Sequence, residues 1–128
     1  MPTSPVRSAL LLDAAFELVG AAMMVVAGGT FADLLNVNRI VLWIAAGVFL
    51  AAGIGIAAAV NADFESRELV WSLAVANIAG GVVLWVLLGV AWGHFEAGGR
   101  WLLGAVADMF ILVGVLEIVA LRRTPVRE

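Results

Sequence analysis

The sequence predicts an all-α integral membrane protein with four transmembrane helices in an antiparallel bundle. Of its 128 residues, 64% are hydrophobic and only 13% are charged, whereas ordinary soluble domains are about 45–50% apolar and about 25% charged. The apolar residues form four runs of about 20 residues, the length that crosses a hydrocarbon core roughly 30 Å thick. The chain length fits a single domain, covering residues 1–128.

The first predicted span covers residues 8–28. Arg7 precedes it, as a basic residue precedes the apolar part of a signal peptide, but Asp13 and Glu17 interrupt the apolar stretch. No convincing small-residue cleavage site follows it. We therefore expect this segment to be retained as a transmembrane helix.

The break after the first span, residues 28–39, contains paired glycines and two asparagines. Within it, Thr30 and the acidic Asp33 three residues later fit a capping box. The pattern predicts a short helical turn that starts at Thr30 and lays its apolar side chains against the membrane interface. These side chains are Phe31, Leu34 and Leu35.

The remaining three spans are separated by a charge-rich break at 61–68 and a glycine-rich break at 93–100 that holds the only histidine. They cover residues 40–60, 69–92 and 101–121. A soluble helical bundle is the competing interpretation, but it requires a polar face on each helix. The second and fourth spans have almost no polar residues, which favours the membrane interpretation.

The orientation follows from the arginines, because loops on the cytoplasmic side carry an excess of basic residues. Only Arg39 and Arg100 lie on the side of the 28–39 and 93–100 breaks. The five on the other side are Arg7, Arg67, Arg122, Arg123 and Arg127. We predict a multi-pass protein of the inner (plasma) membrane with both termini in the cytoplasm. The absence of Lys and the excess of Ala, Gly and Val suggest a GC-rich bacterial genome.

A shift of 61 residues aligns the two halves of the chain at scattered positions. One interpretation is a duplicated helical hairpin whose copies share one membrane orientation, as parallel repeats in transporters do. The other is the shared composition of membrane segments. The aligned pairs include Gly20 with Gly81, Phe49 with Phe110, and Gly53 with Gly114.

Five polar residues fall inside the predicted spans and form the candidate intramembrane polar site or proton path. They are Asp13, Glu17, Asn77, Asp108 and Glu117. A charged side chain at the membrane centre costs roughly 2.5–3.5 kcal/mol on insertion scales, so such residues normally face the bundle interior, pair, or line a polar path. No Arg or His is predicted at these depths to pair with the acids.

Helical geometry predicts where these residues point. Asp13 and Glu17 are one turn apart on one face, and small residues there and beside Asn77 favour close helix contacts. We predict such contacts at Gly20, Gly80 and Gly81. Because desolvation penalises a charged carboxylate, we expect a protonated Glu17 to donate a hydrogen bond to Asn77. Asp13 would then face water and complete a polar ladder from the cytoplasmic face.

Asp108 and Glu117 are nine residues apart, nearly opposite each other around the fourth span, so they cannot both face one point. Glu117 is close enough to Arg122 and Arg123 for its carboxylate to reach the inner interface. Glu17 and Asp108 have two interpretations, a functional acid or a protonated, hydrogen-bonded structural acid. Asn77 is interpreted as an interhelical hydrogen-bonding residue or a ligand.

Several classes of function lack the residues they require. The chain has no cysteine, which excludes disulfides and thiolate metal sites. Its single histidine, His94, is predicted in a loop, so we expect no haem, no metal and no other cofactor. There is no basic stripe for nucleic acid and no nucleophile–base pair for catalysis. The expected partners are the lipid bilayer and either a second copy or another membrane protein.

Short motifs along the chain resemble a widespread bacterial family of small four-span membrane proteins with no assigned function. The motifs are LDA at 12–14, ADLL at 32–35, GVFL at 47–50, Asn77, and LEIVALRR at 116–123. The resemblance implies a fold and a membrane location but no activity, and Glu17 and Asp108 lie outside its pattern. A likeness to small multidrug exporters, which also place a glutamate in their first span, is an analogy, because their later signature stretches are missing.

Two functions follow from this sequence. The first is a non-enzymatic accessory or scaffold-like bundle, which predicts acids that are hydrogen-bonded or at the rim of a packed interior. The second is a small proton- or cation-coupled transporter, which predicts buried acids that converge on a cavity. An enzyme is a third and weaker interpretation.

Overall fold

The computed structural model describes residues 4–124 and contains four long helices and two short ones in that range. The elements are α1 (Pro5–Val26), α2 (Gly28–Leu35), α3 (Arg39–Asn61), α4 (Arg67–Val90), the 3-10 helix η1 (Trp92–His94) and α5 (Ala97–Arg123). By length and composition, α1, α3, α4 and α5 are long and apolar enough to cross a membrane. The predicted all-α bundle with four spans is confirmed, and it indicates a multi-pass membrane protein.

Polar caps extend the helices beyond the apolar runs that predicted them. Ser4 accepts a hydrogen bond from the Arg7 N–H, and Pro5 follows it at the first helical position, which suits a residue without an N–H. Asn38 and Ser66 cap α3 and α4 in the same way. Each of these helices therefore begins one to three residues before its predicted span.

The segment after α1 differs from the prediction. Instead of a turn that starts at Thr30, an eight-residue helix α2 begins at Gly28 and has no side-chain cap. The Phe31 N–H donates to the Ala27 carbonyl, and the Ala27 N–H donates to Met23. Because backbone bonds run from α1 into α2, Thr30 lies inside the first turn and has no capping role. The helix ends at Leu35 and is followed by the cap residue Asn36, whose φ is 52°.

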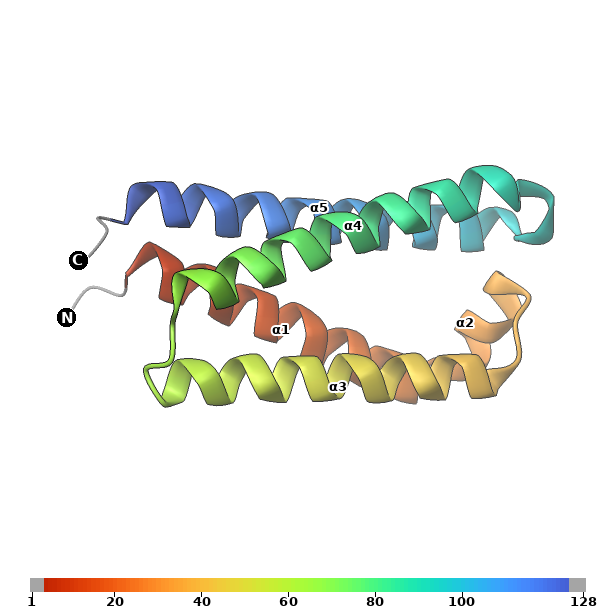
Figure 1. Ribbon diagram of the computed structural model, residues 1–128. Coiled ribbons are helices and arrows are strands. Elements are labelled where there is room, and N and C mark those ends of the chain that lie inside the picture. Colours follow the sequence, from red (N-terminus) through yellow and green to blue (C-terminus); the bar gives the residue numbers. More distant parts are fainter. Residues whose placement is uncertain (1–3, 125–128) are drawn as a thin grey trace.

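Figure 1 shows two antiparallel hairpins, α1–α3 and α4–α5, which meet chiefly where α1 packs against α5. The N- and C-terminal ends of the bundle and the 62–66 loop lie at one end, here called the terminal end, and α2 and η1 lie at the other. From the terminal end α1 slopes away from α5, so the hairpins diverge toward α2. Four of the five arginines predicted on one side lie near the terminal end, and Arg127 lies outside the described residues.

Glycines set the close contacts within each hairpin. In the first, a Cβ on Gly20 would meet Phe49 at 2.8 Å, and one on Gly53 would meet Leu18. In the second, the corresponding contacts are Gly81 with Ile111 and Gly114 with the Ala74 carbonyl oxygen. These glycines form two of the pairs that the 61-residue shift aligns, which supports a duplicated hairpin.

The predicted helix contacts at Gly20 and Gly81 are confirmed, whereas the one at Gly80 is wrong. A Cβ built on Gly80 would have no atom within 4 Å. The reason is angular, since neighbouring residues on a helix point about 100° apart. With Gly81 turned against α5, Gly80 faces open space.

Candidate polar site between the hairpins

Three side chains from three helices meet in the bundle interior: Asp13 of α1, Asn77 of α4 and Glu117 of α5. The Asn77 amide nitrogen donates to Asp13 Oδ2 at 3.0 Å and to Glu117 Oε1 at 2.9 Å. The exposed fractions of the three residues are 1%, 6% and 0%, respectively. One amide therefore bridges two buried carboxyl groups and links the first hairpin to the second.

The donors in this cluster do not satisfy its acceptors. An amide group has two N–H donors, and each carboxyl group has two oxygens that accept hydrogen bonds. Asp13 Oδ1 and Glu117 Oε2 are buried and have no partner among residues 4–124. A proton bound by either carboxyl would convert an acceptor into a donor. The arrangement can therefore hold a proton as well as fix the helices.

Glu17 lies beside this cluster but does not join it. The predicted hydrogen bond from Glu17 to Asn77 is wrong, because Asn77 is bonded to Asp13 and Glu117 and not to Glu17 in the described part of the chain. Along α1, one turn of about 5.4 Å separates Glu17 from Asp13, and it is the Asp13 turn that lies level with Asn77. Glu17 is 6% exposed, and its Oε2 has no partner in the described part of the chain.

An apolar layer closes the cluster toward the terminal end. Leu10 and Val70 are both fully buried there, and they belong to one core cluster. Its other buried members are Val6, Ala9, Ala14, Ile56, Val60, Ala120 and Leu121. Asp13 is therefore not water-facing, and the predicted polar ladder from that end is wrong. Glu117 does not reach the interface either, because this layer covers it.

Asp108 is directed away from the cluster. Asp108 is exposed on the bundle surface, and its Oδ1 accepts a hydrogen bond from Trp85 Nε1 at 2.9 Å. The expectation that Asp108 and Glu117 face different neighbours is confirmed. The sequence did not indicate Trp85 as the partner of Asp108. This pairing depends on how α4 is rotated against α5, and the spacing of residues along one helix does not reveal that rotation.

An aromatic trio connects the two hairpins. Phe16 of α1, Phe49 of α3 and Phe110 of α5 have ring centroids 5.1 to 6.3 Å apart, in tilted or edge-to-face arrangements. Such geometry is favourable for aromatic pairs. The 61-residue shift pairs Phe49 with Phe110, but the position of Phe16 between them emerges only from the fold.

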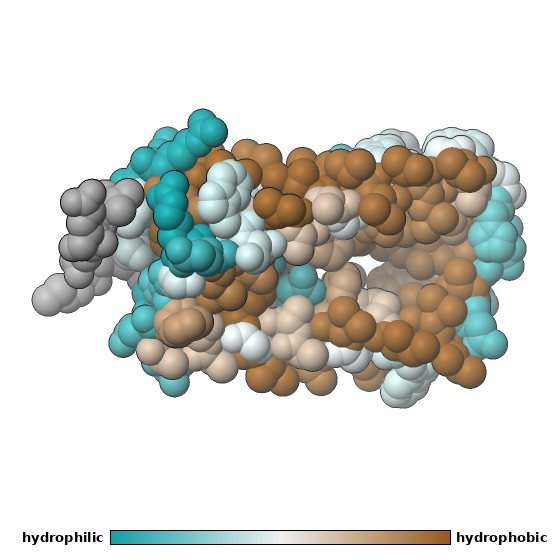
Figure 2. All heavy atoms as spheres, viewed as in Figure 1, coloured by the Kyte–Doolittle hydropathy of each residue, from teal (hydrophilic) through white to brown (hydrophobic). Residues whose placement is uncertain are grey.

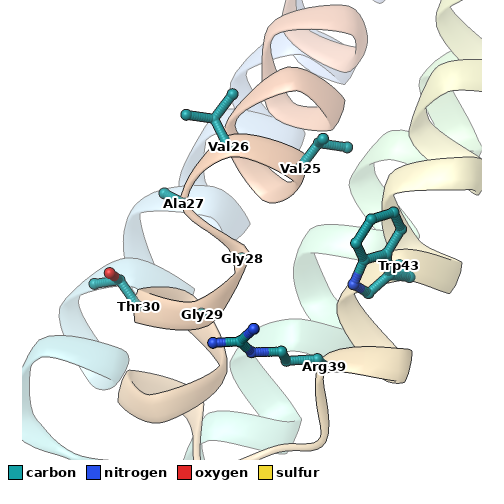
Figure 3. A pocket seen from close by; sticks show the side chains of 8 residues that line it. All are labelled: Val25, Val26, Ala27, Gly28, Gly29, Thr30, Arg39 and Trp43. Carbon is teal, nitrogen blue, oxygen red and sulfur yellow. The ribbon is translucent and has the colours of Figure 1, made fainter.

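A shallow pocket of about 320 Å³ lies at the other end of the bundle, next to α2 (Figure 3). The side chain of Arg39 extends across it toward Gly29, and the Trp43 ring stands on the same side. The remaining lining residues are Val25, Val26, Ala27, Gly28 and Thr30. None of the five polar candidates lines this pocket, so it is separate from the buried cluster.

The single histidine, His94, lies at this end and contacts the residue that follows α2. His94 Nε2 lies 2.9 Å from the Asn36 carbonyl oxygen, and the Asn36 side chain donates to the His94 carbonyl. These contacts connect α2 to η1. Within the described range, no three His, Asp or Glu side chains are placed to hold a metal ion.

Comparison of the chain with protein-family models, curated proteins and solved structures finds no match. The class of protein is therefore described from the fold and the site alone. The chain is a multi-pass, four-helix membrane bundle whose two hairpins are joined by a buried carboxyl–amide–carboxyl cluster.

Proposed function

We propose that this protein is a non-enzymatic accessory or scaffold-like bundle of the bacterial inner membrane. The observation that carries the proposal is the pair of hydrogen bonds from Asn77 to Asp13 and Glu117. Two of the three acids buried in the spans thereby hold α1 against α4 and α5. Acids used in this way serve the stability of the bundle rather than a reaction.

The packing around the cluster supports the same proposal. Fully buried Leu10 and Val70 lie between the cluster and the terminal end, whereas a transporter needs access to its acids. The resemblance to small four-span bacterial proteins fits a bundle that acts through the membrane and a partner. That partner is a second copy or another membrane protein, and the role requires no cofactor or metal.

A small proton- or cation-coupled transporter is the second candidate, and one observation favours it. Glu17 is buried within the first span and makes no hydrogen bond in the described structure. A carboxyl group that stabilises packing is expected to have a partner. An unpartnered one is instead typical of a group that binds and releases something.

Proton flux separates the two candidates. Liposomes that contain the purified protein and an internal pH-sensitive dye are given a potassium gradient and valinomycin. An accessory bundle is expected to acidify them no faster than protein-free liposomes of the same lipid. A faster flux that disappears in Glu17→Gln, with unchanged thermal stability, would contradict the accessory role and support transport. Glu17→Gln suits this purpose because it keeps the side-chain shape and removes the titratable proton.

The proposed orientation makes a separate prediction. Reporter fusions placed after Glu128 and within the 61–68 loop are both expected to be active in the cytoplasm, because most arginines lie on that side. A matched fusion in the 93–100 segment is expected to report the periplasm. A periplasmic signal from either of the first two fusions would overturn the orientation.

A further inference from the structure

Two consecutive glycines keep one wall of the pocket next to α2 free of side chains. A Cβ on Gly28 would meet no atom within 4 Å, and a Cβ on Gly29 would lie 2.6 Å from Arg39 Nη2. A single water needs only about 10–15 Å³ of space, whereas this pocket has about 320 Å³. It therefore has room for a polar group much larger than a water, with the Arg39 side chain directed at the glycine wall (Figure 3).

Arg39 is the charged member of the pocket lining, and it has no partner there. Among residues 4–124 its guanidinium makes no ion pair or hydrogen bond, and Asp33, the acid of α2, does not line the pocket. Arg100, the other arginine at this end, donates to the Trp92 carbonyl oxygen and lies over the Trp92 ring. The fork of N–H donors on Arg39, which matches phosphate and carboxylate groups, is therefore available to a ligand.

The position of this guanidinium is unfavourable without an anion. It lies against Gly29, in the first turn of α2, and that turn has no acid and no side-chain cap. The N-terminal end of a helix carries a partial positive charge, so a cation beside it is repelled and an anion is attracted. An anion in the pocket would be attracted by both groups and would offset their repulsion.

The pocket lies where a membrane protein meets lipid headgroups. Figure 2 shows hydrophilic atoms gathered at the two ends of the bundle and hydrophobic atoms between them. Arg39 is the first residue of α3, and Trp43 follows one turn later, where an interfacial aromatic residue is expected. Three apolar lining residues, Val25, Val26 and Trp43, are also exposed. Acyl chains in the bilayer can therefore contact the side chains that form the pocket.

These features favour a phospholipid over a free anion. A phosphate group accepts two parallel hydrogen bonds from one guanidinium, and the exposed apolar lining suits acyl chains, which inorganic phosphate lacks. They also favour an anionic headgroup. No carboxylate occurs among the lining residues that the structure describes, so a headgroup with an ammonium group would bring a second cation next to Arg39. A glycerol headgroup has hydroxyls that can bond to the hydroxyl of Thr30, another lining residue.

We propose that the pocket binds the head of an anionic phospholipid, with the lipid phosphate held by Arg39. The acyl chains would lie along Val25, Val26 and Trp43, in the leaflet at the α2 end of the bundle. A phosphate between Arg39 and the first turn of α2 would also connect α2 to α3. This inference goes beyond the accessory role proposed above and does not rest on it.

Photolabelling in mixed micelles tests the proposal. A phosphatidylglycerol with a diazirine beside the ester of one acyl chain is added in trace amount to the purified, delipidated protein. Illumination expels nitrogen from the diazirine, the resulting carbene inserts into nearby C–H bonds, and mass spectrometry of peptides locates the added mass. We expect label at Val25, Val26 and Trp43. In Arg39→Gln this label is expected to fall about tenfold, because the loss of charge-assisted hydrogen bonds raises the Kd by about that factor.

Arg100→Gln is the matched control, because it removes the same charge from the same end of the bundle but not from the pocket. It is expected to leave labelling of the pocket residues unchanged. A thermal unfolding scan verifies that each variant is folded. Equal label in Arg39→Gln and the wild type, or an equal loss in Arg100→Gln, would overturn the proposal.

Unlabelled competitors identify the source of the phosphate on the wild-type chain, without dependence on the folding of a variant. Phosphatidylglycerol is expected to remove the label at a lower concentration than phosphatidylcholine with the same acyl chains. Inorganic phosphate at that concentration is expected to leave the label in place. The proposal is refuted if the pocket residues carry no label, or if phosphatidylcholine or inorganic phosphate displaces it as effectively as phosphatidylglycerol does.

Discussion

Gly81→Leu is expected to destabilise the detergent-solubilised protein strongly and to lower its thermal unfolding midpoint. A Cβ at Gly81 would lie 2.6 Å from the Ala107 carbonyl oxygen and 2.5 Å from Ile111 Cγ1. The carbonyl belongs to the backbone of α5, so it moves only if the helix moves. Overpacking of this kind typically costs about 1–3 kcal/mol, and a full leucine side chain at a backbone contact belongs at the upper end.

Gly80→Leu is the matched control for this prediction. Both substitutions replace a glycine inside α4, so both gain the same helix propensity of about 1 kcal/mol, and that gain cancels in the comparison. Gly80 faces open space, so its variant is expected to unfold at or above the wild-type temperature. If the two variants unfold at the same temperature, the close contact between α4 and α5 at Gly81 is refuted.

The fold was predictable because the bilayer leaves a chain few options. In a membrane every backbone polar group needs an internal partner, so an apolar run of sufficient length forms a helix. The four spans follow directly from this rule. The helix ends were less predictable, because Ser4, Asn38 and Ser66 add polar residues to apolar runs. At α2 the local signal at Thr30 was overridden by backbone bonds that continue from α1.

The sequence predicted which residues belong to the candidate site, but it did not predict which of their side chains are hydrogen-bonded to each other. The helical period correctly places Asp13 and Glu17 on one buried face of α1. Which of the two turns meets Asn77 depends on the axial offset between α1 and α4. That offset is set by packing across the hairpins, and no pattern within one helix contains it. The pairing of Asn77 with Glu117 depends likewise on the offset between α4 and α5 within the second hairpin, which neither helix contains by itself.

Asn77→Leu, which removes the bridging amide, is expected to lower the free energy of unfolding. Leucine has nearly the shape of asparagine but has no N–H to donate, so it leaves Asp13 and Glu117 buried without their shared donor. A buried polar group without a partner costs about 1–3 kcal/mol, whereas single interhelical hydrogen bonds in membranes average about 0.6 kcal/mol. We expect a loss of about 1–3 kcal/mol, measured as the free energy of unfolding in mixed micelles.

The control is Asn61→Leu, which removes an exposed amide at the end of α3 and is expected to have almost no effect on the free energy of unfolding.

A change of background separates the hydrogen bonds from the packing of the same side chain. In a chain that already carries Asp13→Leu and Glu117→Met, the amide has no carboxyl to bridge and is itself a buried group without partners. Asn77→Leu in that background is expected to be neutral or stabilising, because replacing all partners by apolar groups of similar shape removes the unpaired polar atoms. An equal loss in both backgrounds would show that Asn77 acts through its volume alone. A loss confined to the wild-type background would show that two hydrogen bonds from one amide hold the hairpins together.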